Sequence, residues 1–216
     1  MFELLGVGIA ESLYMTLVST ALSYLFGLPL GVLLCITDKN GIYRMPGLNR
    51  VLGFIVNFIR SAPFLILLVA ILPFTRAVVG TTIGSTATIV PLVVGATPFI
   101  ARMVEASLKE VDAGVIEAAQ SMGSSTFQII YKVLIPEAKP SLIMGAAISV
   151  TTILGYSAMA GFVGGGGLGA IAINYGYYRY QEDVMLLTVV LLVIIVQVFQ
   201  MVGMKCAKLS DKRIRG

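Results

Sequence analysis

Few side chains in this sequence could carry out covalent chemistry. Histidine, the commonest general base and metal ligand, does not occur among the 216 residues. Cys35 and Cys206 lie far apart in the chain, so neither a disulfide framework nor a zinc site can be built from them. The acidic residues between positions 105 and 117 have no nucleophile near them in the sequence. We therefore predict no catalytic residues, no metal site and no cofactor in this chain.

One glycine-rich run has the spacing of a dinucleotide-binding loop. Gly164, Gly166 and Gly169 fit the pattern GxGxxG. In nucleotide-binding proteins that pattern follows a strand, opens a helix and precedes an acidic residue by about 20 positions. Here an apolar, span-length segment precedes the glycines, and Glu182 comes too early. The ATP-binding pattern GxxxxGK followed by Ser or Thr does not occur either, so we predict no nucleotide site.

The composition is typical of a membrane protein. Hydrophobic residues make up 57% of the chain and charged residues 12%, and the mean hydropathy is +0.94. Soluble domains average about 25% charged residues, so the composition argues against a soluble or disordered chain. The net charge of +4 is not gathered into a basic face with aromatic residues, which argues against nucleic acid as a partner. The sequence predicts one all-α integral membrane domain over residues 1–216.

Long apolar runs, uncharged except for Arg60 in the second, predict five membrane-spanning helices, because a helix needs about 20 apolar residues to cross a bilayer. The longest polar interruption, residues 102–139, lies between the third and the fourth. An odd number of spans places the two ends of the chain on opposite sides of the membrane. The predicted spans are residues 12–37, 51–75, 77–101, 140–163 and 184–204.

The second span has two possible forms. Pro63 restricts the residue before it to extended geometry, and Arg60 stands just before this point. The favoured form is an interfacial helix over residues 51–60 followed by a shorter span over residues 62–75. The alternative is one tilted, kinked helix over residues 51–75, with the Arg60 side chain reaching the cytoplasmic headgroups.

Lysine and arginine are distributed unequally between the two sides of the predicted spans. Cytoplasmic segments of membrane proteins carry an excess of these residues. One set of segments holds twelve of them, and the other holds Arg76 and Arg179. This predicts an external N-terminus, a cytoplasmic C-terminus and a cytoplasmic polar loop. The twelve residues are Lys39, Arg44, Arg50, Arg102, Lys109, Lys132, Lys139, Lys205, Lys208, Lys212, Arg213 and Arg215.

The polar loop has signals for two short helices. Residues 112–122 have helix-forming composition and stop before Gly123, the residue type expected where a helix end needs positive φ. Ser125 stands three residues before Gln128, which is the spacing of a capping box. The second helix is expected to end at Pro136. The two helices would form a compact knob on the cytoplasmic face.

This loop resembles the EAA loop of ABC importer permeases. In that family Glu-Ala-Ala is followed after three residues by Gly, and after nine more by Ile-x-Leu-Pro. The chain departs from this pattern only at Val133 and Ile135, both volume-conserving apolar replacements. The matching residues are Glu117, Ala118, Ala119, Gly123 and Pro136.

The resemblance extends from about residue 12 to residue 204 and is to the methionine-uptake permeases within this class. It implies the type I ABC importer permease fold in a multi-pass protein of the bacterial inner or plasma membrane. It also implies D- or L-methionine as the substrate. The runs that carry it are RSAPF (60–64), PFTR (73–76), VGT (79–81), PFIARMVE (98–105) and GYSAM (155–159).

The partners are implied by the same resemblance. A homodimer within membrane lipid would place ten spans around a central path. Two cytoplasmic ABC ATPase subunits would bind ATP, and an external methionine-binding lipoprotein would deliver the substrate. The first knob helix would be the coupling helix, in which Glu117, Ala118, Ala119 and Gly123 contact the ATPase. Pro136 belongs to the same coupling loop.

Tyr156, Ser157 and Met159 are candidates for the translocation path or its gate. Methionine is flexible and polarisable, so two Met159 side chains facing each other across a dimer axis could close a pore. The alternative for a methionine in a span is a packing or lipid-facing position.

Other glycines are expected to act in packing or in turns. Gly27 and Gly31 have the four-residue spacing that permits close helix contact in a bilayer, although bending is an equal alternative. The run 164–169 is predicted to be a flexible external loop that caps the fourth span, or a surface packed against the binding protein.

Three other functions stay open on the sequence. The importer could carry another small amino acid or an oxyanion. A non-transporting membrane anchor or assembly factor would bind a partner through the loop without supporting ATP-dependent uptake. A membrane enzyme is less favoured, because neither histidine nor a nucleophile accompanies the acidic residues of the loop.

Overall fold

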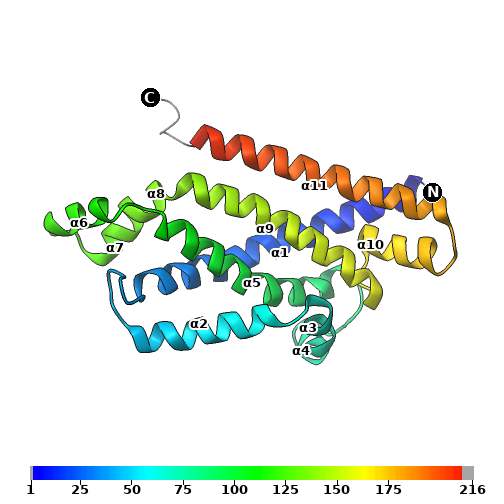
Figure 1. Ribbon diagram of the computed structural model, residues 1–216. Coiled ribbons are helices and arrows are strands. Elements are labelled where there is room, and N and C mark those ends of the chain that lie inside the picture. Colours follow the sequence, from blue (N-terminus) through cyan, green and yellow to red (C-terminus); the bar gives the residue numbers. More distant parts are fainter. Residues whose placement is uncertain (1, 211–216) are drawn as a thin grey trace. The chain divides into compact units, whose positions relative to one another are not determined.

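Residues 2–210 are described in the computed structural model, and all their regular structure is helical (Figure 1). The prediction of an all-α chain is confirmed for these residues. The segments η1 and η3 are π-helical, and η2 is a short 3-10 helix. In chain order the elements are α1 (Phe2–Ile36), α2 (Pro46–Ser61), α3 (Phe64–Ala70), α4 (Leu72–Val79), α5 (Ser85–Lys109), α6 (Ala113–Ser121), α7 (Thr126–Ile129), η1 (Ile130–Leu134), α8 (Ile135–Glu137), α9 (Lys139–Met159), η2 (Ala160–Val163), α10 (Gly167–Ile171), η3 (Ala172–Tyr177) and α11 (Glu182–Ser210).

Four helical stretches within residues 2–210 are long and apolar enough to cross a membrane, and the bent pair α2 and α3 would supply a fifth span. With 35 residues, α1 is about 52 Å long, more than the about 30 Å of a bilayer's hydrocarbon core. This helix begins at Phe2, ten residues before residue 12, where the first span was predicted to start. Of the basic residues that predict the orientation, Lys212, Arg213 and Arg215 lie outside the described residues.

The chain has neither one helix over residues 51–75 nor one short helix over residues 62–75. The first helix, α2, ends at Ser61, and Pro63 has the extended backbone angles φ −56° and ψ 129°. Proline lacks the N–H that would continue the helical hydrogen bonds, and it disfavours helical geometry before it. The helical path breaks again at Ile71, between α3 and α4.

The helix of the third predicted span is displaced along the chain. This helix, α5, begins eight residues after the predicted start at residue 77 and ends eight residues after the predicted end at residue 101. Gly80 and Gly84 have φ values of 84° and 99° and turn the chain between α4 and α5. The uncharged run from residue 77 contains this turn, so the absence of charge did not mark the start of the helix.

The chain forms two compact units, and α1, α5, α9 and α11 contribute residues to both. The first unit consists of Met1–Ser23, Ala62–Ala96 and Ile148–Met201. Side chains from α1, α10 and α11 form a buried apolar cluster in it. Its members are Leu5, Leu168, Ile171 and Val184.

The glycine-rich run is packed inside the first unit. The Gly167 N–H donates a hydrogen bond to the Glu11 carboxylate at 2.7 Å, and the next N–H donates to the Ser12 hydroxyl at 2.9 Å. The Thr88 hydroxyl donates to the Gly165 carbonyl at 3.2 Å. These contacts bring the backbone of the run so close to α1 and α5 that a Cβ at Gly165 would lie 2.7 Å from the Thr88 hydroxyl oxygen.

Replacing Gly167 with alanine is expected to destabilise the first unit by about 2–4 kcal/mol, because left-handed strain and crowding add. The φ of Gly167 is 73°, and a Cβ there would lie 2.6 Å from the Ser12 hydroxyl oxygen. Gly80 is the matched control, since its φ is 84° but a Cβ would meet nothing within 4 Å. Gly80→Ala should cost the strain alone, about 1–2 kcal/mol. Thermal unfolding of the purified chain in detergent measures both losses, and equal losses would contradict the crowding.

The second unit consists of Tyr24–Ser61, Thr97–Ala147 and Val202–Gly216. In this unit α1 and α5 approach so closely at Gly31 that a Cβ there would lie 2.5 Å from the Ala101 carbonyl oxygen. One turn earlier, a Cβ at Gly27 would meet the Ile100 side chain at 2.8 Å. The predicted close contact through these two glycines is confirmed.

A polar contact holds α2 on α1 within the same unit. The Asn49 side-chain amide donates to the Leu34 carbonyl at 2.7 Å and to the Thr37 hydroxyl at 3.1 Å. Leu34 and Val56 are buried together with Ala101 of α5 in one apolar cluster. The second unit therefore has a base of three packed helices, from which the polar loop extends.

Candidate functional site

The first helix of the polar loop forms where the sequence predicted it. The Asp112 carboxylate accepts a hydrogen bond from the Gly114 N–H at 2.7 Å and caps α6 at its start. The helix runs over Ala113–Ser121, and Gly123 follows with φ 75°. The Gly123 N–H donates to the Gln120 carbonyl at 2.9 Å. The predicted left-handed glycine at the helix end is confirmed.

The second helix begins with the predicted capping box. The Ser125 hydroxyl accepts from the Gln128 N–H at 3.4 Å, and the Gln128 side chain accepts from the Ser125 N–H at 2.8 Å. This reciprocal pair satisfies two N–H groups at the start of α7. We call α6, α7 and the turn between them the knob.

Pro136 does not end the second helix, contrary to the prediction. The path continues from α7 through η1 and α8 to α9, with Pro136 in the first turn of α8. In the π-helical turn the Ile135 N–H donates to the Ile130 carbonyl, five residues back. A proline ring normally clashes with the carbonyl four residues before it, and the wider π-turn accommodates a proline without ending the helix.

The residues of the EAA pattern differ in exposure. Glu117 and Ala118 are exposed, whereas Ala119 is only 3% exposed, and its carbonyl accepts from the Ser124 N–H at 3.1 Å. Ala119 therefore packs inside the knob. The contact of Ala119 with an ATPase stays a prediction, and within this chain its side chain is buried.

The outer surface of the knob carries large apolar side chains that the sequence analysis missed. Met122 is 78% exposed and Phe127 75% exposed, and the Phe127 ring stacks on the exposed Tyr131 ring with centroids 6.4 Å apart. Apolar side chains on a polar, solvent-facing loop mark an interaction surface. The i,i+4 spacing of the two aromatic residues is the sequence signal that could have revealed them.

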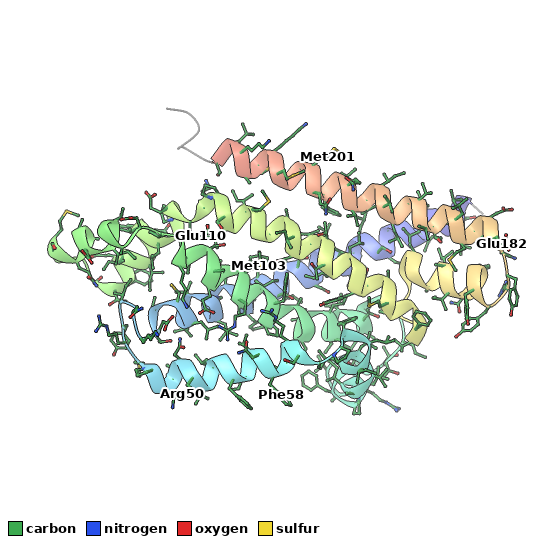
Figure 2. All side chains as sticks on the ribbon, in the orientation of Figure 1. Arg50, Phe58, Met103, Glu110, Glu182 and Met201 are labelled. Atoms are coloured by element: carbon green, nitrogen blue, oxygen red, sulfur yellow. The ribbon has the colours of Figure 1, made fainter. Side chains whose placement is uncertain are left out.

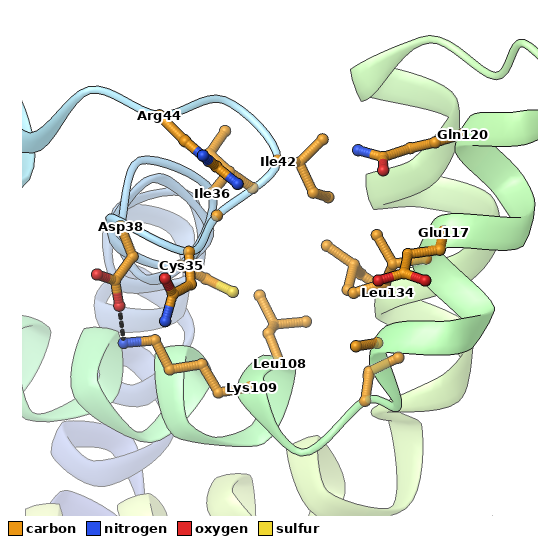
Figure 3. Close-up of a pocket in the computed structure, with 15 residues that line it drawn as sticks. Cys35, Ile36, Asp38, Ile42, Arg44, Leu108, Lys109, Glu117, Gln120 and Leu134 are labelled. Atoms are coloured by element: carbon orange, nitrogen blue, oxygen red, sulfur yellow. Dashed lines mark ion pairs between the residues drawn. The ribbon is translucent and has the colours of Figure 1, made fainter.

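A pocket of about 460 Å³ lies between the knob and the end of α1 (Figure 3). Glu117 and Gln120 line it from α6, while Cys35 and Asp38 line it from the end of α1 and the following loop. Leu108 contributes an apolar wall from α5. The EAA glutamate thus faces the α1–α2 loop as well as solvent.

An ionic network links this pocket to α2. Glu105, only 7% exposed, accepts from Arg102 at 2.6 Å and from Lys109 at 2.8 Å. Lys109 also pairs with Asp38 at 2.6 Å, and Arg102 donates to the Asn57 side-chain oxygen at 2.9 Å. The pair of Arg102 with Glu105, expected from their three-residue spacing, is confirmed. The links to the other helices required the tertiary structure.

This network lies next to the knob in the chain and is ionic at neutral pH. The hydrogen bond from the Lys109 ammonium lowers the pKa of the Asp38 carboxyl below its usual value, so the ion pair persists at neutral pH. Lys109 precedes Asp112, the cap of α6, by three residues. The first knob helix therefore follows directly on the end of α5 that carries the network, and the network joins that end to α2 and to the loop after α1.

The three path candidates lie in the first unit, apart in sequence from the coupling residues of the second unit. The Tyr156 ring stacks on Phe64 with centroids 4.2 Å apart, and Met159 is 46% exposed at the end of α9. Ser157 is 1% exposed, and its hydroxyl donates to the Leu154 carbonyl of its own helix at 2.8 Å. The place of Ser157 in the translocation path stays a prediction, and within this chain its hydroxyl bonds to its own helix.

The residues that the structure describes contain no group of three or more Cys, Asp or Glu side chains placed to hold a metal ion. The arrangement is built from the knob, an ionic network and packed helices.

Comparison with known proteins gives one consistent family. Residues 23–216 match the family described as "Binding-protein-dependent transport system inner membrane component". The "Probable D-methionine transport system permease protein MetI" of Vibrio cholerae serotype O1 (strain ATCC 39315 / El Tor Inaba N16961) is 49% identical, over 98% of this chain and 94% of that protein. The "Methionine import system permease protein MetP" of Bacillus subtilis (strain 168) is 45% identical, over 84% and 82%.

A solved structure agrees with these sequences. The structure described as "Inward facing conformations of the MetNI methionine ABC transporter" superimposes with a TM-score of 0.97 at 50% identity, covering 98% of each chain. The type I permease fold implied by the sequence resemblance is confirmed by this match. The chain belongs to the family of binding-protein-dependent transport system inner membrane components, which are membrane-embedded transport subunits of ABC transporters.

Proposed function

We propose that this chain is the membrane-spanning subunit of an ATP-driven importer of D- or L-methionine. The observation that carries the proposal is the similarity, over nearly the whole chain, to permeases named for methionine transport. The methionine-uptake runs, such as GYSAM at residues 155–159, support the same substrate. No bond of the substrate is made or broken by this chain.

The knob is proposed to be the contact with the ATPase. Glu117 and Ala118 are exposed on α6, and Met122 and Phe127 add apolar area on the same loop. Gly123 sets the turn between the two helices. ATP is bound by the partner subunit, and closure of two such subunits moves the knob and, through the ionic network, the membrane helices.

The assembly is proposed to be a homodimer with external N-termini and cytoplasmic C-termini. The excess of lysine and arginine in one set of segments supports this orientation. Five spans in one chain are too few to enclose a path, so a second copy supplies the other wall. An external methionine-binding lipoprotein delivers the substrate, and no cofactor is held by this chain.

The translocation path is proposed to pass Tyr156 and Met159. Tyr156 is fixed by its stacking on Phe64, while Met159 is exposed and flexible. A fixed aromatic wall beside a polarisable, adaptable side chain suits the apolar thioether side chain of methionine. Alternating exposure of this region to the two sides completes transport.

Uptake of labelled methionine tests the substrate. Cells lacking this chain should take up little label at low external concentration, and restoring the wild-type chain should recover uptake that unlabelled D- or L-methionine competes away. Competition by another amino acid or an oxyanion, and not by methionine, would overturn the substrate while leaving the importer class. ATPase binding without uptake of any tested solute would favour a membrane anchor and overturn the proposed function.

A further inference from the structure

A groove of about 680 Å³ lies where the polar loop joins α9. Two cations line it, Lys132 from η1 and Lys139 from the first turn of α9. Its apolar wall is formed by Ile135, Leu142 and Ile143, together with Ala146 further along α9. All these residues belong to the second unit.

The groove crosses from a polar margin into a membrane-spanning helix. Lys139 is the first residue of the apolar stretch Lys139–Tyr177, which is long enough to cross a bilayer. Ala146 follows seven residues later, about 10 Å along the helix axis at 1.5 Å per residue. A cationic end at the membrane boundary therefore continues into an apolar wall within the hydrocarbon.

The charge of the groove is not neutralised by the chain. Among residues 2–210, no ion pair or hydrogen bond is formed by the ammonium of Lys132 or Lys139, and the lining contains no acidic side chain. Glu137, the acid between them in sequence, lines a separate pocket of about 150 Å³. Two exposed, uncompensated cations above an apolar wall complement a ligand with an anionic head and an apolar tail.

We propose that this groove binds an anionic phospholipid, with its phosphate between Lys132 and Lys139 and an acyl chain along Leu142, Ile143 and Ala146. This goes beyond the proposed transport function and does not depend on the identity of the substrate. Basic pockets at the membrane boundary bind anionic headgroups, and each cation near an anionic surface contributes about fivefold in affinity. The bound lipid would brace the junction between the knob and α9.

Fluorescence quenching by brominated lipid tests the groove. The chain has no tryptophan, so Ile143→Trp gives one reporter on the apolar wall in the full chain. We expect this reporter to be quenched several-fold more effectively by dibrominated phosphatidylglycerol than by dibrominated phosphatidylcholine at the same mole fraction in vesicles. A reporter at Val193→Trp on α11, where the valine side chain is 53% exposed, should be quenched equally by the two lipids.

Charge variants distinguish a site from general attraction to anionic lipid. In the Ile143→Trp chain, the double change Lys132→Gln and Lys139→Gln should bring the ratio of quenching by the phosphatidylglycerol to quenching by the phosphatidylcholine close to one. The matched control removes two positive charges outside the groove, Lys39 and Arg50, the latter on α2 (Figure 2), and should keep the preference. Equal quenching of the Ile143→Trp reporter by the two lipids would overturn the proposal. An equal loss of the lipid preference in the groove variant and in the control variant would overturn it too. Loss of the preference on adding the ATPase subunits would assign the groove to a protein partner and also overturn it.

Discussion

Replacing Gly123 with valine is expected to reduce ATP-dependent uptake at least about tenfold while leaving the chain inserted in the membrane. Gly123 has φ 75°, a conformation that costs a non-glycine residue about 1–3 kcal/mol. A β-branched side chain resists it most. The turn between α6 and α7 must then open, which displaces Met122 and Phe127 from their shared surface. Uptake of labelled methionine, with the amount of inserted chain measured in parallel, gives the effect.

The geometry at Gly123 makes this a test of backbone conformation alone. A Cβ at Gly123 would meet nothing within 4 Å, so valine adds no steric clash at that atom. Gly47 is the matched control, because a Cβ there also meets nothing within 4 Å and its φ is not positive. Gly47→Val should keep near wild-type uptake. Full uptake by Gly123→Val would show that the turn does not set the coupling.

Replacing Glu105 with glutamine is expected to lower the free energy of unfolding by about 2–3 kcal/mol. Breaking a buried ion pair by removing one partner costs about 3–5 kcal/mol, and the partial exposure of Arg102 and Lys109 reduces that loss. Glutamine keeps the shape of the side chain and removes the charge that holds both cations. For a chain of this size the unfolding midpoint in detergent should fall by about 5–10 °C.

A neighbouring acid provides the control for this variant. Glu110, just after α5, is exposed and forms no ion pair among the described residues, so Glu110→Gln should change stability by less than about 0.5 kcal/mol (Figure 2). In a double-mutant cycle, Arg102→Gln should cost much less once Glu105 is glutamine. Additive losses would refute the coupling of these two residues.

Signals close together in the sequence predicted the class of fold and the knob. Uncharged runs predicted a helical membrane protein, and the spacing of Gly123, Ser125 and Gln128 predicted the turn and the capping box. These predictions succeed because a cap or a left-handed glycine is determined by residues within one helical turn. The EAA resemblance likewise depends on a short pattern with fixed spacing.

The same local reasoning failed where a longer-range geometry decides the outcome. Pro136 was expected to end a helix, but the wider π-turn before it accommodates the proline ring, and the helical path continues. The buried positions of Ala119 and Ser157 could not be read from their residue types, because small side chains occur on both faces of a helix. Exposure depends on which other helix packs against each face.

By itself, then, the sequence determined a helical membrane chain with a capped knob of two short helices. The tertiary structure decided which side chains the glycine run and the charged residues contact. Glu11 meets Gly167 across 156 residues, and Asp38 meets Lys109 across 71 residues. Such contacts arise only when helices distant in sequence pack side by side, since hydrogen bonds and ion pairs act over a few ångströms and leave no periodic pattern along the chain.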